Sequence, residues 1–218
     1  MRTSRIVCLL AAVLICGCAG KKVELTQSGF LSNYSQLQED EVIDGMKIYR
    51  NEVVDIAGQY SKIMVAPVVI QLGLDQKDAK LSEEDRQKLS DYFHEQLVAK
   101  LQNDYEITEE RGEGVLLLRS AITDILANKV YLNLHWSTTL VGAGIGGASI
   151  EAELVDSLSG ERILAFIDAM KGRRLDITEP SKLFPTYTDG LTKWGHTKYA
   201  LEFWAEILVD NLSQLRDR

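Results

Sequence analysis

The residues best suited to covalent chemistry are three cysteines, Cys8, Cys16 and Cys18, and all of them lie near the start of the chain. A cysteine thiolate is a strong nucleophile, and it can accept an acyl or alkyl group. Because no cysteine follows Cys18, the rest of the chain can form neither a disulfide framework nor a thiol-based active site. Thiol chemistry is therefore confined to the first eighteen residues.

The segment from Leu14 to Cys18 resembles the bacterial lipobox. It has an aliphatic residue at Ile15, a small residue at Gly17 and the acceptor cysteine at Cys18, whereas Cys16 stands where Ala or Ser is commoner. Small neighbours leave the thiol accessible to a modifying enzyme. This resemblance implies lipid attachment at Cys18, with fatty-acyl chains such as palmitate.

The residues before Cys18 have the pattern of a secretory signal peptide. Arg2 and Arg5 form a basic start, and residues 6–17 carry no charge. This apolar run is shorter than the roughly 20 residues that a membrane-spanning helix needs. We therefore predict that residues 1–17 are a cleaved lipoprotein signal peptide.

The sequence after the cleavage site predicts the domain organisation and the location of the mature protein. Residues 18–28 would be the lipidated cysteine and a short tether, followed by a single domain over residues 29–218. Ala19 follows the acceptor, and family experience links Asp at that place to retention in the inner membrane. We expect the domain to face the periplasm from the outer membrane.

The charge of the chain argues against nucleic acid as a partner. The formal net charge is −8, and loss of Arg2 and Arg5 with the signal peptide makes it more negative. Such a surface repels phosphate backbones. Short acidic runs, among them residues 39–41, are interpreted as solvated faces.

No catalytic, metal or cofactor site is predicted. His94, His135 and His196 lie far apart and lack a second ligand at zinc-site spacing. The chain also has no Gly-x-Ser-x-Gly nucleophile elbow. Serines and carboxylates could still assemble in space, so the enzyme question stays open, with a noncatalytic protein favoured.

The glycine-rich stretch 142–147 does not fit a phosphate-binding loop, because an alternating strand follows it rather than a helix. One interpretation is a turn between two strands. The alternative is an exposed contact loop, since the stretch from Trp136 to Gly147 is uncharged. The candidate partner contacts on this loop are Trp136, Leu140, Val141 and Ile145.

Trp194, just before the last predicted helix, is a further candidate partner contact. Its large ring could instead pack at the helix start and lock it there. A Trp194→Ala variant separates the two roles, because a pure binding anchor would lose its partner and keep its melting temperature.

Hydrophobic patterns in the sequence predict the strands and helices that position the candidate residues named above. Residues 46–49, 62–72 and 115–126 are apolar strand-like runs, and Pro67 places the second at a sheet edge or bulge. Residues 148–154 and 163–169 alternate around the turn 157–160, which predicts a hairpin with one buried face. A capping box at Ser82 begins a run of apolar residues at helical spacing, which predicts a helix. The same spacing over residues 198–215 predicts a second helix. Residues 29–37 are expected to lie as an irregular arm against the fold.

Two amphipathic helices need a surface on which to bury their apolar stripes. The simplest arrangement is an α+β single domain, with a mainly antiparallel sheet of about four or five strands and both helices packed on one face. A lipoprotein signal peptide precedes it.

Several segments in this order resemble a known family. They are Ser28–Leu31 with Tyr34, Leu81–Ser82 with Tyr92–Phe93, Gly147–Glu153 with Asp156 and Ser159–Glu161, and Lys193–Gly195 with Trp204–Ala205. Together they are similar to the bacterial lipoproteins grouped as domain of unknown function family 3313, over residues 28–215. The resemblance implies an envelope lipoprotein and no established activity.

The sequence thus predicts a lipid-anchored cell-envelope protein, held to the membrane through Cys18. We expect a noncatalytic module near the outer membrane that binds an envelope protein partner or forms a homo-oligomer. The alternatives are a periplasmic hydrolase with a spatially assembled site and a subunit of an envelope export or pore assembly.

Overall fold

A long β-hairpin forms the centre of the molecule. Its strands are β7 (Gly147–Asp156) and β8 (Arg162–Lys171), which pair antiparallel along nearly their whole length. The connecting turn is closed by the Asp156 carboxylate, which accepts hydrogen bonds from the amides of Leu158 and Ser159, and Gly160 there adopts a φ of 74°. The predicted hairpin is confirmed.

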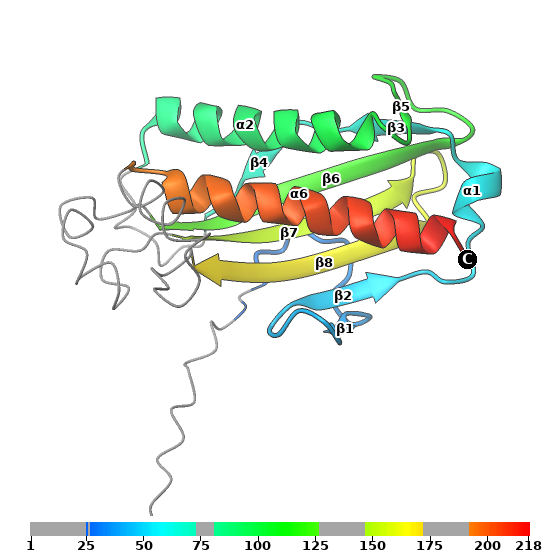
Figure 1. Ribbon diagram of the computed structural model, residues 1–218, viewed down its shortest axis with the longest axis horizontal. Helices are drawn as coiled ribbons and strands as arrows, with labels where there is room; N and C mark the ends of the chain where they lie inside the picture. The colour runs from blue at the N-terminus through cyan, green and yellow to red at the C-terminus, as the bar shows by residue number, and fades with distance from the viewer. Residues whose placement is uncertain (1–24, 26, 73–80, 127–146, 172–191) are drawn as a thin grey trace, which may run out of the picture.

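The computed structural model describes residues 25, 27–72, 81–126, 147–171 and 192–218 (Figure 1). Its sheet has eight strands in the order β1-β2-β8-β7-β6-β3-β5, and β4 pairs with β6. The remaining strands are β1 (Gln38–Glu39), β2 (Lys47–Arg50), β3 (Lys62–Val65), β4 (Val69–Ile70), β5 (Glu106–Ile107) and β6 (Val115–Leu126).

The sheet is mixed rather than mainly antiparallel. The pairs from β1 through β8 and β7 to β6 are antiparallel, whereas β3 and β4 pair parallel with β6 and β5 pairs parallel with β3. A long helix separates β4 from β6 in the sequence, and such a crossover returns the chain in the parallel direction.

The predicted number of four or five strands is wrong. Pro67 divides the single expected run 62–72 into β3 and β4, because proline cannot donate to a ladder. In addition, β1 and β5 have two residues each, too few to show an alternating pattern. The α+β class itself is confirmed.

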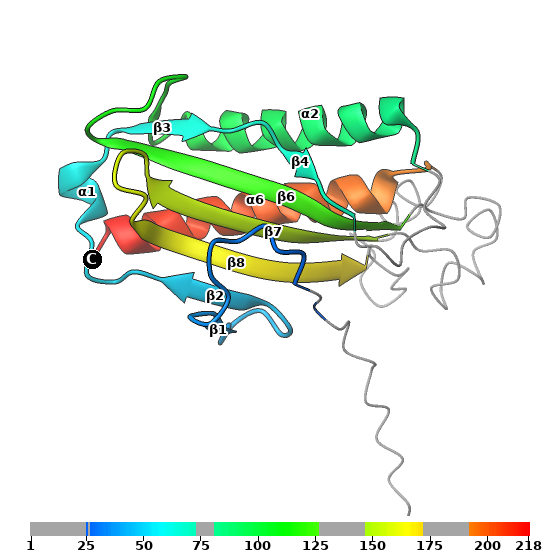
Figure 2. The ribbon, with the colours of Figure 1, turned by 180° about the vertical axis from the view of Figure 1, so that it is seen from behind.

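Two long helices cover the same face of the sheet, as predicted. They are α2 (Glu83–Leu101) and α6 (Gly195–Arg216), which lie side by side in front of the strands in Figure 1 and behind them in Figure 2. The Ser82 hydroxyl accepts a hydrogen bond from the Asp85 amide at 3.1 Å and caps α2. A four-residue helix, α1 (Ile56–Gln59), is the third helix of the described part and was not predicted.

The main core lies between these helices and the sheet. Trp204 of α6 and Phe93 of α2 are buried there against aliphatic side chains of β6, β7 and β8. None of the helices in the described ranges is long and apolar enough to cross a membrane. The predicted signal peptide, Cys18 and the tether up to residue 24 lie outside the described residues and stay predictions.

Candidate functional site

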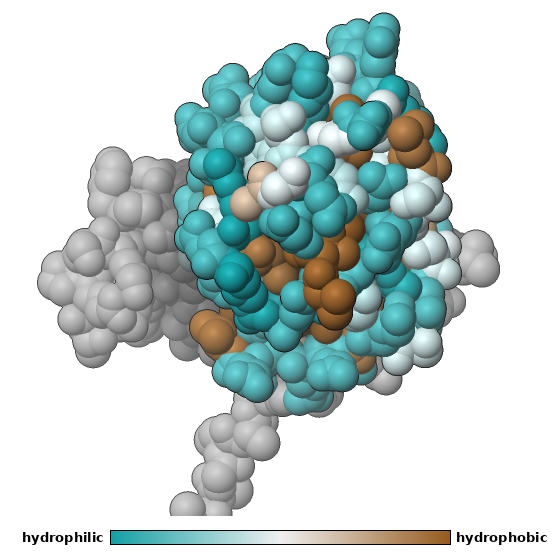
Figure 3. All heavy atoms as spheres, turned by 90° about the vertical axis from the view of Figure 1, so that its right-hand side faces the viewer, coloured by the Kyte–Doolittle hydropathy of each residue, from teal (hydrophilic) through white to brown (hydrophobic). Residues whose placement is uncertain are grey.

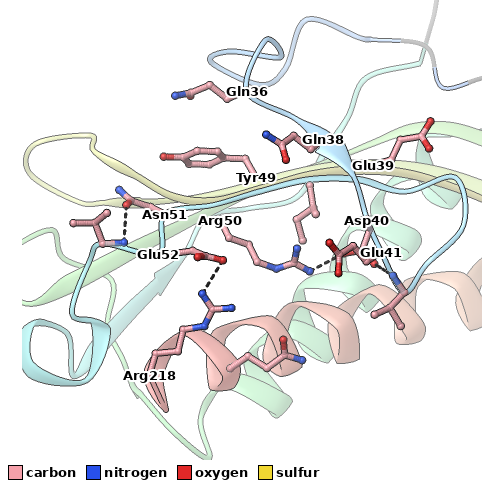
Figure 4. Close-up of a pocket in the computed structure, with 14 residues that line it drawn as sticks. Gln36, Gln38, Glu39, Asp40, Glu41, Tyr49, Arg50, Asn51, Glu52 and Arg218 are labelled. Carbon is pink, nitrogen blue, oxygen red and sulfur yellow. Dashed lines mark hydrogen bonds and ion pairs between the residues drawn. The ribbon is translucent and has the colours of Figure 1, made fainter.

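A polar cleft of about 790 Å³ follows the β1–β2 edge of the sheet (Figure 4). Residues between 36 and 42 form one wall and residues 48–53 form the floor. Gln214 in the last turn of α6 and Arg218, just after this helix, form the other wall. The cleft is thus built from three separate parts of the sequence.

The cleft exists because strand β2 is only partly covered by β1. The β1–β2 ladder pairs Gln38 with Ile48 and Glu39 with Lys47. Tyr49 and Arg50 therefore have no strand partner on that side among the described residues, whereas on the other side they pair with β8. The sheet edge stays open where it borders the cleft.

Both arginines of the cleft are held by acidic partners. The Arg50 Nη2 atom lies 2.7 Å from Asp40 Oδ2, and its Nε donates to Asn211 Oδ1 at 2.7 Å. Arg218 forms an ion pair of 2.7 Å with Glu52. Although burial alone would raise it, hydrogen bonds from Arg50 and the Ile43 and Val42 amides hold the Asp40 pKa below its usual range.

The remaining polar groups of the cleft are uncharged amides, a phenol ring and carboxylates. Gln38, Gln214, Glu39 and Glu41 are exposed and make no side-chain hydrogen bond or ion pair within the part of the chain that the structure describes. The Tyr49 ring lines the floor, with the Arg162 guanidinium 5.2 Å from its centroid.

An arm of residues 28–36 crosses the sheet and leads into the cleft wall (Figure 2). Two buried glutamates of β7 hold this arm on the sheet. Glu151 accepts hydrogen bonds from the Ser28 amide at 2.6 Å, from the Leu31 amide at 3.3 Å and from the Tyr34 hydroxyl. Burial, together with this contact to Glu151, raises the Tyr34 pKa.

Glu153 holds the middle of the arm. It accepts from the Ser32 amide at 3.2 Å and hydroxyl at 2.8 Å, and its other oxygen lies 3.0 Å from Arg119. Further along, Arg162 donates to the Asn33 carbonyl and to Gln36 Oε1 at 2.8 Å. These contacts confirm the predicted arm and fix the wall of the cleft.

The expectation of a hairpin with one buried face is therefore wrong. Glu151 and Glu153 stand at the alternating positions that appeared solvent-facing, yet their exposures are 0% and 1%. The arm that covers them is more than 100 residues away in sequence, and no local pattern indicates that contact.

Trp194 lies at the start of α6, where it is half-buried against the core. Its Nε1 donates to Asp85 Oδ1 at 2.9 Å, and Lys193 Nζ lies 2.6 Å from Asp85 Oδ2. These contacts join the first turns of α2 and α6 and support the helix-lock interpretation. Trp136, Leu140, Val141 and Ile145 lie outside the described residues, and their contact role stays a prediction.

Asp168 and Tyr60 are two further groups with shifted pKa values. Burial raises the pKa of Asp168, which accepts from Trp204 Nε1 at 2.7 Å. Burial and the neighbouring Asp156 raise the pKa of Tyr60 to about 12. In the ranges that the structure describes, no three His, Cys, Asp or Glu residues are placed to hold a metal ion.

The sequence and the fold were compared with known proteins. The family model described as Protein of unknown function (DUF3313) matches residues 26–206, which is more than half of the chain. No curated protein matches the sequence.

Several solved structures have a loosely similar fold. A PelC dodecamer from Paraburkholderia phytofirmans, in a single-substitution form, is 12% identical with a TM-score of 0.40, and the match covers 78% of this chain and 95% of that one. Protein XCC0632 from Xanthomonas campestris is 9% identical with a TM-score of 0.40, covering 73% and 90%. The lipoprotein GNA1162 from Neisseria meningitidis is 12% identical with a TM-score of 0.33, covering 61% and 99%. At these TM-scores, the assembly and activity of those proteins are not inferred for this chain.

Proposed function

The chain belongs to the family described as Protein of unknown function (DUF3313), and from this premise we propose that it is a noncatalytic, lipid-anchored binding module of the bacterial cell envelope. In this proposal, lipid on Cys18 holds the protein at the outer membrane, with its domain in the periplasm. The cleft beside β2 holds the partner.

The main observation that supports the proposal is the cleft beside β2. Its volume of about 790 Å³ lies within the range of about 300–1,000 Å³ typical of ligand sites. The side chains of Gln38 and Gln214 are unpaired within the described ranges and are available to a partner. The ion pair of Arg50 with Asp40 and the contacts of the arm hold the walls in place. Because the walls are already ordered, less conformational entropy is lost when a partner binds.

The contacts of Asp40 fit a structural charge of the cleft wall rather than a proton donor. A general acid or base needs a pKa near the working pH. Against the effect of burial, the pKa of Asp40 is lowered, because hydrogen bonds from Arg50 and from the Ile43 and Val42 amides favour its ionised form. Asp168, whose pKa is raised, faces the core and bonds Trp204 instead.

The anchor is supported by the lipobox at Leu14–Cys18 and by the charge-free stretch before it. Cells expressing the full precursor with radiolabelled palmitate test this part directly. We expect label on the native chain and none on Cys18→Ser. Equal label on both chains, or none on either, would refute the anchor.

The binding role is tested by chemical crosslinking in intact cells, followed by mass spectrometry. The native chain is expected to capture a defined envelope component or a discrete self-oligomer, and Cys18→Ser is expected to lose it. If neither chain captures anything beyond background, the binding-module proposal fails.

A further inference from the structure

We propose that the ligand of the β1–β2 cleft is a neutral oligosaccharide. This inference rests on the proposed binding function and deepens it, because it names the chemical class of the partner. It follows from which groups in the cleft are already paired and which are free.

An anionic ligand does not match the charges of the cleft. Arg50 and Arg218 are the arginines that line it, and each already has a carboxylate partner at 2.7 Å, although the exposed Arg218–Glu52 pair is weaker than the largely enclosed Arg50–Asp40 pair. Glu39 and Glu41 add exposed negative charge without a described partner. A phosphate or carboxylate group would therefore meet repulsion and no free cation.

An apolar ligand does not match the lining either. Pockets for apolar molecules are lined mainly by hydrophobic and aromatic side chains. Here the aliphatic members are the buried Ile48 and two strongly exposed valines, Val42 and Val53, while the sticks of Figure 4 are mainly amides, carboxylates and guanidinium groups. The ligand must be one that replaces water at many polar groups.

The free groups fit the hydroxyls of a sugar. Each carboxamide carries both a donor and an acceptor, and each sugar hydroxyl is also both. Gln38 and Gln214 offer complete carboxamides from opposite walls, and Gln36 retains its NH₂ group because Arg162 bonds only its oxygen. The free carboxylates of the wall can accept hydrogen bonds from further hydroxyls.

The floor adds a surface on which a sugar ring can pack. Tyr49 lines the cleft, and aromatic rings present a weakly negative face to polarised C–H groups. The Arg162 guanidinium already lies over one face of this ring, 5.2 Å from its centroid, so a sugar would contact the part of the ring that Arg162 leaves uncovered. Arg162 also holds Gln36 at 2.8 Å. Floor and wall are therefore fixed relative to one another before a ligand arrives.

The test is isothermal titration of the full lipidated chain, kept in a detergent without a sugar headgroup. The probes are the neutral tetrasaccharides chitotetraose, cellotetraose and maltotetraose, with tetragalacturonate as the anionic comparison. We expect at least one neutral probe to bind and tetragalacturonate to give no heat of binding.

The variants Gln38→Ala and Gln214→Ala place binding in the cleft. Each removes exposed hydrogen-bonding groups and is expected to weaken the neutral probe about threefold to tenfold. Gln87→Ala, an exposed glutamine on α2, is the matched control and should leave affinity unchanged. Unchanged melting temperatures show that all three variants remain folded.

The sugar proposal is overturned if all three neutral probes fail to bind, if the cleft variants leave binding intact, or if tetragalacturonate binds more tightly. It is also overturned if a lysine-rich peptide displaces the neutral probe completely at lower concentration. Partner capture in cells together with failure of all three sugars would remove this inference and leave the binding function standing.

Discussion

Buried carboxylates of this protein differ in how their charge is compensated. Asp40 has an arginine and two backbone amides, Glu151 has two amides and a phenol, and Asp168 has the Trp204 indole N–H and the Ala169 amide. An ionised carboxylate buried with few donors is costly, whereas one with several is stable. Of these three acids, Asp168 is the one whose pKa is raised, because burial outweighs its neutral donors.

Asp168→Asn should therefore be tolerated. The amide oxygen still accepts from Trp204, and the buried charge is removed, so we expect stability at pH 7 to be unchanged or higher. Asp168→Ala leaves the indole N–H unpaired and should lower the free energy of unfolding by about 1–3 kcal/mol. Urea unfolding of both variants measures the difference.

The pH dependence follows from the raised pKa of Asp168. The folded chain keeps this proton to a higher pH than the unfolded chain, so the native protein loses stability as pH rises from about 4 through the folded pKa. Asp168→Asn should lack this decrease. A variant whose stability curve between pH 4 and 7 parallels that of the native chain would contradict the assignment.

Glu151→Ala should release the arm while the helices and sheet stay folded. Loss of three hydrogen bonds at a site of 0% exposure is expected to cost about 1–3 kcal/mol of unfolding free energy. Hydrogen exchange at the Ser28 and Leu31 amides should rise strongly. Glu113→Ala, an exposed glutamate, is the control, and equal exchange in both variants would disprove the clamp.

Sequence could not reveal these residue roles. The run 39–41 was interpreted as a solvated face, but the Asp40 side chain is only 3% exposed because Arg50 and a local turn enclose it. The cleft combines short segments around residues 36–42 and 48–53 with the end of α6, and none of them forms a motif. Such a site depends on contacts between distant segments.

At the scale of elements, periodic segments were predictable and short ones were not. The strand over 115–126 and the cap of α2 match the sequence patterns, because each contains enough residues to show a period or a capping contact. The last helix begins at Gly195 rather than Lys198. The parallel pairing of β3 with β6 depends on the crossover through α2, which no local pattern shows.

The corner between α2 and α6 gives a prediction about Trp194. Trp194→Ala removes packing against the core and the bond to Asp85, so we expect a loss of about 2 kcal/mol, less than for a fully buried tryptophan. Trp194→Phe should lose less because it keeps the ring packing. A Trp194→Ala chain with native melting temperature and no partner capture would instead support a binding anchor.

The stability that the contact between Asp85 and the start of α6 contributes should decrease at low pH. Lys193, Trp194 and Ser82 donate to Asp85 and hold its pKa well below the usual range. The contribution of this carboxylate is present above the unfolded pKa of about 4 and is lost as pH falls through the folded pKa. Asp85→Asn should flatten the stability curve below pH 4, and thermal melts across that range measure it.

At the scale of the whole molecule, the arm links the predicted anchor to the centre of the sheet and to the cleft. A tether of about ten residues spans at most roughly 35 Å, so a chain lipidated at Cys18 would keep the domain close to its membrane. Figure 3 shows one end of the molecule, with a mainly hydrophilic surface around a hydrophobic area. Partners would have to be reached within the envelope layer next to that membrane.

The most direct test of the account places a photo-crosslinking amino acid at Gln214 in the cleft and, as control, at Lys88 on the exposed side of α2. Each chain is expressed in intact cells with Cys18 present. The account predicts a discrete envelope adduct from position 214 and none from position 88. An adduct from both positions alike, or from neither, would contradict the claim that the cleft is the binding site of a lipid-anchored module.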